Sequence, residues 1–414
     1  MKNKIKKKLE EIKTSNSFRV RKIKDSGNSH TFTFKNKEFL SFASNDYLSL
    51  SADKRIINSA KKALENYGYS TGSSALISGY TKSHFKLEEE ISDFLGQEKT
   101  LLFSTGYQAN LGVINALVDR GDNIISDKLN HASLIDGAIL SRANFKRYKH
   151  NDYKNLEELL KKLKKKNNLI ISDSLFSMDG DYPNLKKIYA IVKKYKSSLL
   201  IDEAHAIGVY GEKGKGFVHA NSLNNKTDIV ITGTFGKAFG TFGAFLSGKY
   251  ENVEYVLQKA RSYTYSTSLP VNAVEATRKS LKIISTEDWR REKLFSLIDY
   301  YKKNINNSGF VSLNSNSQIQ AILIGDSKDA IHVSDALLKN GIYIPPIRPP
   351  TVEEGKSRLR ISLTVDHEES DIDYLINILQ KISINLVQSE NVPKNKNIAW
   401  CYWWNCCLQI SRNC

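Results

Sequence analysis

An α/β protein with a mostly parallel central sheet wrapped by helices is predicted by three features of the sequence. Apolar runs of four or five residues recur from residue 100 onward, and helical patterns separate them. Such uninterrupted runs are typical of parallel strands that are buried on both faces. The chain has 414 residues, which is too long for one small core and suits two or three domains that fold together.

Before residue 100, the sequence predicts helices, one hairpin and one turn-rich stretch. The hairpin is indicated by alternating apolar and polar residues, and the turns by crowded glycine and serine. In chain order these elements are a basic helix over 1–17, a hairpin over 31–42, a helix over 54–67, a Gly/Ser-rich segment over 68–80 and a helix over 87–96.

The apolar runs are expected to be the strands of the central sheet. Between them, four leucines at helical spacing in 154–166 indicate an amphipathic helix with a solvated lysine face. A long helix over about 270–285 leads out of this region. The predicted strands are 100–103, 123–126, 169–172, 198–202, 228–232 and 243–248.

The rest of the chain predicts a smaller α+β layer. Residues 286–385 are expected to form a helix, three strands and a helix from Glu369, the strands being QAILIG, GIYIPPI and RLRISL. We therefore divide the sequence into an N-terminal helix and hairpin segment (1–50), a large domain (51–285), a small C-terminal α+β domain (286–386) and an atypical tail (387–414).

The tail differs in composition from the chain before it. All four cysteines and three of the four tryptophans lie after residue 399. No two of these cysteines have the C-x2-C spacing of a zinc site, so no metal is expected. We expect this segment to be poorly ordered, and we leave open whether it is genuine or the product of a frameshift.

The net charge is ambiguous. Lys and Arg number 61 against 44 Asp and Glu, which gives +17. Such a charge attracts nucleic acid, CoA phosphates or an acidic carrier protein, but we favour the simpler explanation of lysines scattered over the surface of a compositionally biased protein. No aromatic residues are interleaved with the basic runs, so no nucleic acid partner is expected. No run reaches the roughly 18 apolar residues of a membrane helix, so we expect no membrane partner and a cytoplasmic protein.

Polar residues with catalytic chemistry follow the predicted strands. Asp202 ends one strand and His205 comes three residues later, Lys237 lies among glycines after the next strand, and His131 follows another. Ligands bind beyond the carboxyl ends of parallel strands. Lys237 does not belong to a nucleotide-binding P-loop, because position 231 is Ile and Ala238 replaces the required hydroxyl.

Pyridoxal phosphate requires a lysine, an acid, a histidine and a helix N-terminus for its phosphate, and the sequence offers all four. Its aldehyde forms a Schiff base with a lysine, and a carboxylate keeps its pyridine nitrogen protonated. The segment STGY at 104–107 begins a helix whose amides could hold the phosphate. The residues therefore predict pyridoxal 5'-phosphate as cofactor.

Together these segments resemble the α-oxoamine synthases, over roughly residues 10–385. The matching blocks include FASNDYLSL, STGYQANLGVI, LNHASLIDGA, FSMDGDYPNL, IDEAHAIGVYGEKGKG, TFGKAFG and IRPPTVEEGKSRLRISLT. The resemblance implies the fold type I of pyridoxal-phosphate-dependent transferases. It also implies that Lys237, His131 and Asp202 are catalytic. The cofactor-binding residues it implies are Gly106, Tyr107, His131, Ser177, Asp202, His205, Thr234 and Lys237.

For substrate, the resemblance implies Arg360 as the clamp of the amino acid carboxylate. Arg19, His131, Thr351 and Asn45 are the other implied substrate contacts. The segment RPPT at 348–351 favours the branch that condenses L-alanine with a pimeloyl thioester, carried by CoA or by an acyl-carrier protein, in biotin biosynthesis. A homodimer is implied as well.

Two alternatives remain open. One is a glycine-using member of this group, either a 2-amino-3-ketobutyrate CoA ligase or a 5-aminolevulinate synthase. The other is a non-catalytic partner subunit, although such subunits lack the lysine that this chain has at position 237.

Overall fold

The computed structural model describes residues 1–27, 30–163 and 166–388, so the predicted tail falls almost wholly outside the described residues. Contacts between residues divide the chain into two units. Unit 1 consists of residues 1–44, 178–180 and those from 292 onward, and unit 2 consists of 45–177 and 181–291.

Unit 2 is built on a seven-stranded sheet of order β3-β9-β8-β7-β6-β4-β5. β9 runs opposite to the other six strands, which confirms the mostly parallel sheet predicted from the sequence. Its strands are β3 (Lys99–Phe103), β4 (Asn123–Asp127), β5 (Asn144–Tyr148), β6 (Asn168–Asp173), β7 (Ser198–Asp202), β8 (Ile229–Thr234) and β9 (Ala244–Gly248).

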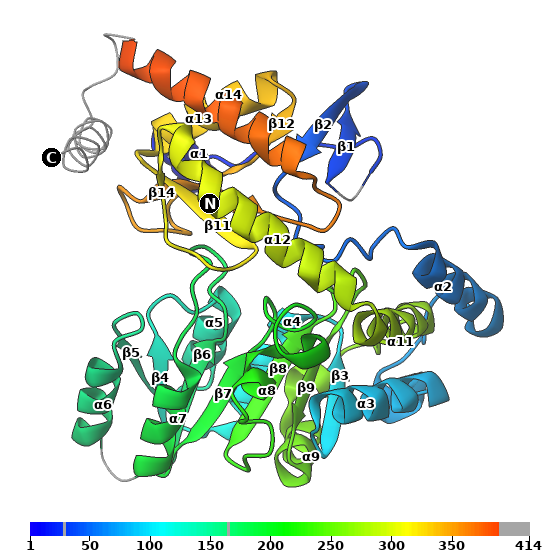
Figure 1. Cartoon of the computed structure of the whole chain (residues 1–414). Helices are drawn as coiled ribbons and strands as arrows, with labels where there is room; N and C mark the ends of the chain where they lie inside the picture. The colour runs from blue at the N-terminus through cyan, green and yellow to red at the C-terminus, as the bar shows by residue number, and fades with distance from the viewer. Residues whose placement is uncertain (28–29, 164–165, 389–414) are drawn as a thin grey trace, which may run out of the picture. The chain divides into compact units, whose positions relative to one another are not determined.

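Helices cover both faces of this sheet (Figure 1). Leu199, Leu200 and Ile201 point alternately to the two faces of β7, and all three are buried. The helices of unit 2 are α2 (Lys54–Tyr67), α3 (Lys82–Leu95), α4 (Gly106–Leu117), α5 (Ala132–Leu140), α6 (Tyr153–Lys162), α7 (Leu185–Lys194), α8 (Gly216–Ala220), α9 (Tyr250–Lys259), α10 (Arg261–Thr264) and α11 (Val271–Thr286).

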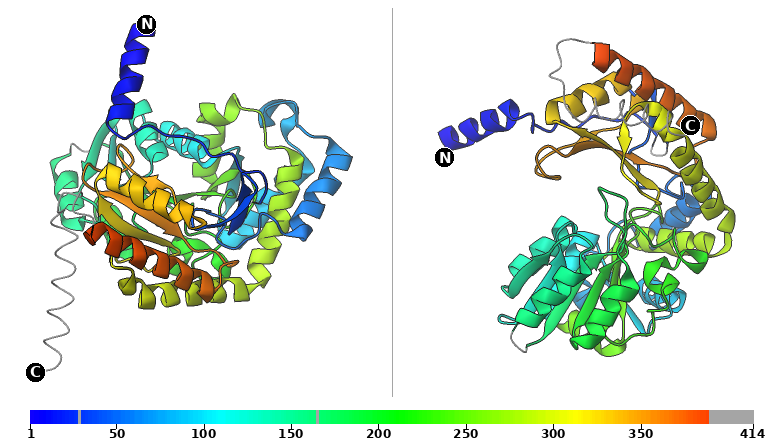
Figure 2. Two further views of the ribbon diagram at one scale, coloured as in Figure 1. Left: turned by 90° about the horizontal axis from the view of Figure 1, so that it is seen from above. Right: turned by 60° about the vertical axis from the view of Figure 1, so that its left-hand side comes forward.

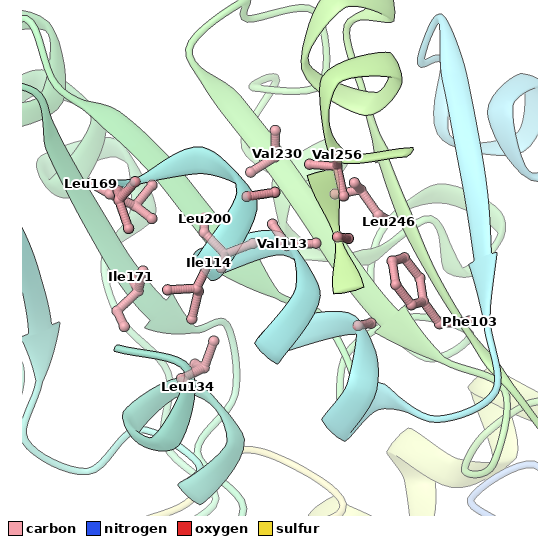
Figure 3. Close-up of a cluster of buried hydrophobic side chains, with 14 of the residues drawn as sticks. Phe103, Val113, Ile114, Leu134, Leu169, Ile171, Leu200, Val230, Leu246 and Val256 are labelled. Carbon is pink, nitrogen blue, oxygen red and sulfur yellow. The ribbon is translucent and has the colours of Figure 1, made fainter. Parts of the chain in front are cut away.

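One hydrophobic cluster joins α4 and α5 to the sheet (Figure 3). Val113 and Ile114 of α4 and Leu134 of α5 are fully buried, and Leu200 and Leu246 are among the strand residues in the same cluster. Burying an aliphatic side chain of this size contributes about 1.5–3 kcal/mol. The cluster therefore fixes the helix that begins at Gly106 and the one that follows His131.

Unit 1 contains a four-stranded sheet of order β10-β11-β14-β13 and a three-stranded sheet of order β1-β2-β12. Helix α12 (Asp288–Asn304) begins in unit 2 and continues into unit 1. Within unit 1, helix α1 extends away from the other elements, and none of its residues is buried (Figure 2). The remaining elements are α1 (Lys2–Thr14), β1 (Thr31–Phe34), β2 (Lys37–Ser41), β10 (Val311–Ser312), β11 (Ile319–Gly325), α13 (Ser327–Lys339), β12 (Ile342–Tyr343), β13 (Pro346–Ile347), β14 (Ser357–Ser362) and α14 (Glu369–Gln388).

The hairpin predicted over 31–42 is confirmed as β1 and β2, which pair antiparallel. Its two turn residues, Lys35 and Asn36, have φ of 51° and 58°. Positive φ at both central residues is the turn geometry that matches the twist of a hairpin.

Three other expectations were wrong in detail. The helix expected at 87–96 begins at Lys82, because Thr81 and His84 cap its first turn reciprocally. The helix expected to reach residue 166 ends at Lys162, and Leu163 is extended. The single strand expected in GIYIPPI is two short strands, of which β12 pairs with β2 and β13 pairs with β14. Pro345 lies between them, and proline donates no hydrogen bond to a ladder.

Within the described residues, no helix is both long enough and apolar enough to cross a bilayer.

Candidate active site

Three parallel strands of unit 2 bring polar side chains to one edge of the sheet. Asp202, the last residue of β7, lies in register with Asp173 of β6 on one side and Thr232 of β8 on the other. Residues in register on neighbouring strands point to the same face. Asp202 and Asp173 are buried, so two carboxyl groups lie side by side with little solvent.

Helix α4 holds the Asp202 carboxylate through Asn110. The Asn110 amide donates to Asp202 Oδ2 at 2.7 Å and accepts from the Thr232 hydroxyl at 2.8 Å. The backbone N–H of Ala204 donates to Asp202 Oδ1 at 2.9 Å. Both oxygens of this carboxylate are therefore fixed by neutral donors. Among the described residues, no cationic side chain forms an ion pair with Asp202.

Lys237 lies in a chain of hydrogen bonds with His205 and Tyr47. Lys237 Nζ is 2.7 Å from His205 Nε2, and His205 Nδ1 is 2.7 Å from the Tyr47 hydroxyl. Tyr47 in turn donates to Asn45 Oδ1 at 3.1 Å. One proton assignment satisfies the whole chain, with Lys237 donating to Nε2 and the Nδ1 proton donated to Tyr47. His205 then accepts from the lysine, and Tyr47 keeps its ring oriented.

The turn that carries Lys237 packs closely against the segment 45–51. Gly240 has φ +63°, and a Cβ there would lie 2.4 Å from Ser51 N. That segment is itself shaped by Asp46, whose carboxylate accepts from Leu50 N and Ser51 N, each at 2.9 Å. The glycine therefore allows the lysine turn to approach the segment that bears Tyr47.

Replacing Gly240 with Ala is expected to destabilise the protein by about 2 kcal/mol or more, because a Cβ has no space beside Ser51. Denaturant unfolding measures this change. Gly355→Ala is the matched control, because Gly355 has φ +75° with nothing within 4 Å of the added Cβ. Equal losses in both variants would assign the effect to backbone conformation and not to packing.

His131 precedes α5, and its backbone N–H donates to Asp173 Oδ2 at 2.7 Å. Its Nδ1 lies 2.7 Å from the Ser133 hydroxyl, while the residue remains exposed. Desolvation lowers the pKa of His131 and favours the neutral imidazole, although the Asp202 charge opposes this shift. Burial, and then the charge of Asp202, raise the pKa of Asp173 well above its ordinary value. The histidine is thus neutral, fixed at its backbone and open to a ligand.

The first turn of α4 lies beside the end of β8. A Cβ on Gly106 would be 3.7 Å from Thr234 Cβ, so the helix begins next to Thr234. Thr105 caps the helix by accepting from Gln108 N at 3.2 Å. The N–H groups of the first helical residues have no partner within a helix, and the helix dipole favours an anion there. Thr234 itself donates to Gly243 O at 3.0 Å.

Tyr107 and Ser177 complete the predicted residues of unit 2. The Tyr107 hydroxyl donates to Asp136 of α5, and the side chain is half-exposed. Ser177 follows β6, in a turn closed by the hydrogen bond from Phe176 N to Asp181 O at 2.9 Å. Both residues therefore follow strands of the central sheet on their carboxyl side.

The three substrate residues predicted in unit 1 fall into two places. Arg360 lies on β14, is buried, and donates to the Ser362 hydroxyl at 2.8 Å. Arg19 donates to the Thr351 hydroxyl at 3.0 Å. Arg348 donates to Phe18 O at 3.2 Å and to Asn16 O. Its pKa is lowered by burial and by the nearby charge of Arg19. The RPPT segment thus holds the backbone on which Arg19 lies.

Sequence reasoning missed four polar residues of this region. Tyr47 and Asn110 hold His205 and Asp202, Asp173 lies beside Asp202, and Glu203 anchors the loop after β7. Glu203 accepts from Val218 N at 2.6 Å and Phe217 N at 3.1 Å, and burial raises its pKa to about 7. Asp173 had a signal, because it ends a buried apolar run as Asp202 does.

The residues of unit 2 fit pyridoxal phosphate. A buried carboxylate without a cationic ion-pair partner in the described part of the chain suits a protonated ring nitrogen, which carries a positive charge. Lys237 offers a primary amine, and the start of α4 offers N–H groups for a phosphate. His205 and Ser177, which follow β7 and β6, offer further polar side chains.

Comparison with known proteins places the sequence among enzymes that use this cofactor. It matches the family model "Aminotransferase class I and II" over residues 37–379. It is 42% identical over 384 residues to an 8-amino-7-oxononanoate synthase of Saccharophagus degradans, which covers 92% of this chain and 97% of the relative. The enzyme of that name from Nitrosomonas europaea is 41% identical over 369 residues, or 89% of this chain and 95% of the relative.

Solved structures agree with these relatives. Serine palmitoyltransferase from S. paucimobilis, with a bound adduct of pyridoxal phosphate and myriocin, aligns with a TM-score of 0.87 at 28% identity, over 92% of this chain and 97% of that one. The 8-amino-7-oxononanoate synthase of Francisella tularensis aligns with a TM-score of 0.72 at 29% identity, over 84% of this chain and 98% of that one.

Proposed function

The chain belongs to the class I and II aminotransferase family and to its 8-amino-7-oxononanoate synthases, and on that premise we propose that it condenses L-alanine with a pimeloyl thioester. The products are 8-amino-7-oxononanoate, CO2 and a free thiol. The nine carbons of the product are the three of alanine and the seven of the pimeloyl group, less the one lost as CO2. The observation that carries this proposal is the pairing of Lys237 with His205 beside the buried Asp202, which has no cationic ion-pair partner among the described residues.

Pyridoxal phosphate, when bound, supplies an electron sink that stabilises negative charge at the α-carbon of the amino acid. The protein has to hold that group and move protons around it. Lys237 Nζ provides the covalent attachment. Asp202 would hold the proton on the ring nitrogen, and the α4 amides with Thr234 would hold the phosphate. With cofactor bound, His205 would carry its proton on Nε2 and donate it to the phenolic oxygen, while its Nδ1 accepts from the Tyr47 hydroxyl.

Lys237 also provides the base. In its neutral form Nζ can remove the proton from the α-carbon of alanine and return a proton after CO2 has left. In the structure, His205 Nε2 lies 2.7 Å from Nζ and accepts a hydrogen bond from this amine. His131 is neutral at the same edge and can contact the ring or the substrate.

Unit 1 supplies the proposed substrate clamps. A guanidinium binds a carboxylate through two parallel hydrogen bonds, which suits Arg360 to the carboxylate of alanine. Arg19 with Thr351, and Asn45 from unit 2, are proposed to contact the acyl substrate. The RPPT segment supports this, because it positions Arg19.

Replacing Arg360 with Lys is expected to raise the KM for L-alanine about 10- to 100-fold, because lysine keeps the charge but loses the two-point contact. Steady-state kinetics at saturating acyl thioester measure it. Arg120→Lys is the control, since Arg120 is exposed on unit 2. An unchanged KM for alanine would remove Arg360 from the amino acid site.

The proposed activity is tested by thiol release from purified full-length protein with cofactor. We expect release with L-alanine and pimeloyl-CoA or pimeloyl-carrier protein, and a comparison of the two donors identifies the one preferred. Release with glycine and a short acyl-CoA alone would instead establish the glycine-using alternative. A colourless preparation that ignores added pyridoxal phosphate would favour the non-catalytic subunit.

A homodimer is proposed as well, because unit 2 exposes large apolar side chains around the segment 68–80. Tyr69 is 78% exposed, Ile77 80% and Tyr265 73%. Ser268 N donates to Ser73 O at 3.0 Å, so the segment 68–80 adjoins the one that follows Tyr265. Exposed apolar groups gathered in one region are typical of protein interfaces.

A cytoplasmic location is also proposed, since residues 1–400 contain no cysteine that could form disulfides.

Replacing Ile77 with Glu is expected to convert the dimer to a monomer, because a buried charge at an interface is costly. Light scattering after size exclusion measures the mass. Ile384→Glu is the control, since Ile384 is 39% exposed on α14 in unit 1. A monomeric wild-type protein would refute the dimer.

A further inference from the structure

His150 lies between two carboxylates and has no assigned role in the proposed reaction. It follows β5, with Nδ1 2.9 Å from Asp127 Oδ1 and Nε2 2.7 Å from Asp181 Oδ2. The Asp127 side chain is fully buried, and the Phe176 and His150 rings pack nearly perpendicular with their centroids 4.5 Å apart. An imidazole donates from both nitrogens to two carboxylates only when both nitrogens carry protons. A carboxylate at each ring nitrogen favours the imidazolium, and the Asn151 Nδ2 amide also lies 3.2 Å from Nε2.

Asp127 organises the loop that leads to His131. Its Oδ1 also accepts from Leu129 N at 2.8 Å, and its Oδ2 accepts from Asn151 N at 2.9 Å. The carboxylate at the end of β4 thus fixes the backbone two residues before His131. Losing the positive charge of His150 would leave this buried carboxylate with only neutral donors in the contacts described.

Asp181 organises the turn that contains Ser177. Its backbone oxygen accepts from Phe176 N at 2.9 Å, and its carboxylate accepts from Asn151 Nδ2 at 3.0 Å. One protonated ring therefore connects the two loops on which His131 and Ser177 lie. The backbone polar groups of these loops are held by the same two carboxylates.

We propose that His150, as an imidazolium, is a positioning residue that holds the His131 loop and the Ser177 turn in the geometry that the cofactor site requires. The part of this inference that concerns cofactor and substrate rests on the proposed function. The triad of Asp127, His150 and Asp181 does not depend on it.

The charges around His150 support a persistent proton. Burial lowers its pKa, but the hydrogen bonds to Asp127 and Asp181, together with their charges, outweigh burial and raise the pKa to about 9. The other ionisable groups near the two carboxylates are Tyr148, Tyr153 and Asp173. Burial raises the pKa of both tyrosines, so they stay neutral across this range.

The sign of the pH dependence follows from the raised pKa. In the unfolded chain His150 titrates near its ordinary value of about 6.5, whereas in the folded chain it titrates near 9. The stabilisation is complete below pH 6.5 and is lost as the pH rises through 9. Between pH 6.5 and pH 9, the thermal unfolding temperature of the wild-type protein should therefore fall by more than the unfolding temperature of a variant without the imidazole.

The first test is a direct titration of His150 in the full-length protein with cofactor bound. Nitrogen NMR of histidine-labelled protein reports the protonation of each ring, and the His150 signal is the one missing from His150→Gln. We expect both nitrogens to stay protonated until about pH 9. A midpoint near 6.5 would overturn the proposal, and this outcome does not depend on which substrate the enzyme uses.

The second test compares His150→Gln, Asp181→Asn and the double variant. We expect each single variant to raise the dissociation constant of pyridoxal phosphate and the KM for L-alanine by about tenfold, because a displaced loop misplaces its contacts. The double variant should lose little more, since both changes break one connection. His332→Gln, an exposed histidine of α13, is the matched control.

The outcomes separate the proposal from its premise. Lower unfolding temperatures with unchanged cofactor and alanine binding would make His150 a structural residue and overturn the positioning role. Additive losses in the double variant would do the same. If wild-type protein bound cofactor but released no thiol from pimeloyl thioesters, the proposed function would fail, while the titration and cofactor measurements would still decide the role of His150.

Discussion

Replacing Lys237 with Ala should reduce turnover by at least about 10³-fold, the largest effect expected of any single change. In the proposed reaction the amine is both the covalent attachment and the base, so one substitution removes two functions. His205 cannot replace it, because its Nε2 would face the space that Nζ had occupied 2.7 Å away. Pyridoxal phosphate should still bind, since the carboxylate, the phosphate site and the histidines remain.

The measurement combines thiol release with the absorbance of bound cofactor. Borohydride should fix the cofactor covalently to wild-type protein and leave none on the variant. Lys61→Ala is the matched control, because Lys61 is exposed on α2 and far from the sheet edge in sequence. Turnover by the Lys237→Ala protein at wild-type rates would mean that another residue carries the cofactor.

Much of this site could be predicted from sequence because its main residues follow strands. Asp202, Lys237 and Thr234 each end or follow a buried apolar run, and the carboxyl ends of parallel strands meet at one edge. His205 was predicted because it lies only three residues after Asp202. Their positions at the ends of predicted strands were therefore enough to predict that these side chains belong to one site.

The residues that hold them could not be found in this way. Tyr47 lies 158 positions from the histidine it orients, and Asn110 lies 92 positions from Asp202. Neither residue type is unusual where it stands, so only the folded chain reveals these pairs. The same is true of His150, which contacts one aspartate 23 positions before it and one 31 positions after it.

Strand β5 shows a second limit of sequence reasoning. The run NFKRY at 144–148 was not predicted as a strand, because three of its five residues are exposed and two are basic. It is one of the two edge strands of the sheet, so it needs neither two apolar faces nor a continuous apolar run. The inner strands were predicted from their continuous apolar runs, which result from burial on both faces.

Asp202→Asn is expected to have the second-largest effect, a loss of about 10²–10³-fold in kcat/KM. A neutral amide accepts a hydrogen bond but cannot stabilise a proton on the ring nitrogen, so the cofactor becomes a weaker electron sink. Among the described residues Asp202 has no cationic side chain within ion-pair distance, which supports its proposed role toward the ring nitrogen.

Stability distinguishes this electrostatic role from a structural one. In the asparagine variant, an amide N–H₂ would face Ala204 N and lose one hydrogen bond worth about 1 kcal/mol, while the cost of burying a charge disappears. These changes oppose each other, so the free energy of unfolding without cofactor should stay within about 1 kcal/mol of wild type. Denaturant unfolding of the cofactor-free protein measures it.

Asn110→Ala provides the comparison. It keeps the Asp202 charge but removes the donor at 2.7 Å and leaves the Thr232 hydroxyl without its acceptor. We expect it to destabilise the protein by about 1–3 kcal/mol and to reduce activity less than Asp202→Asn does. The two variants should therefore differ. Asp202→Asn should lose activity while its stability is unchanged, and Asn110→Ala should lose stability first. If Asp202→Asn instead retained activity and Asn110→Ala abolished it, the charge at position 202 would not be what the reaction uses.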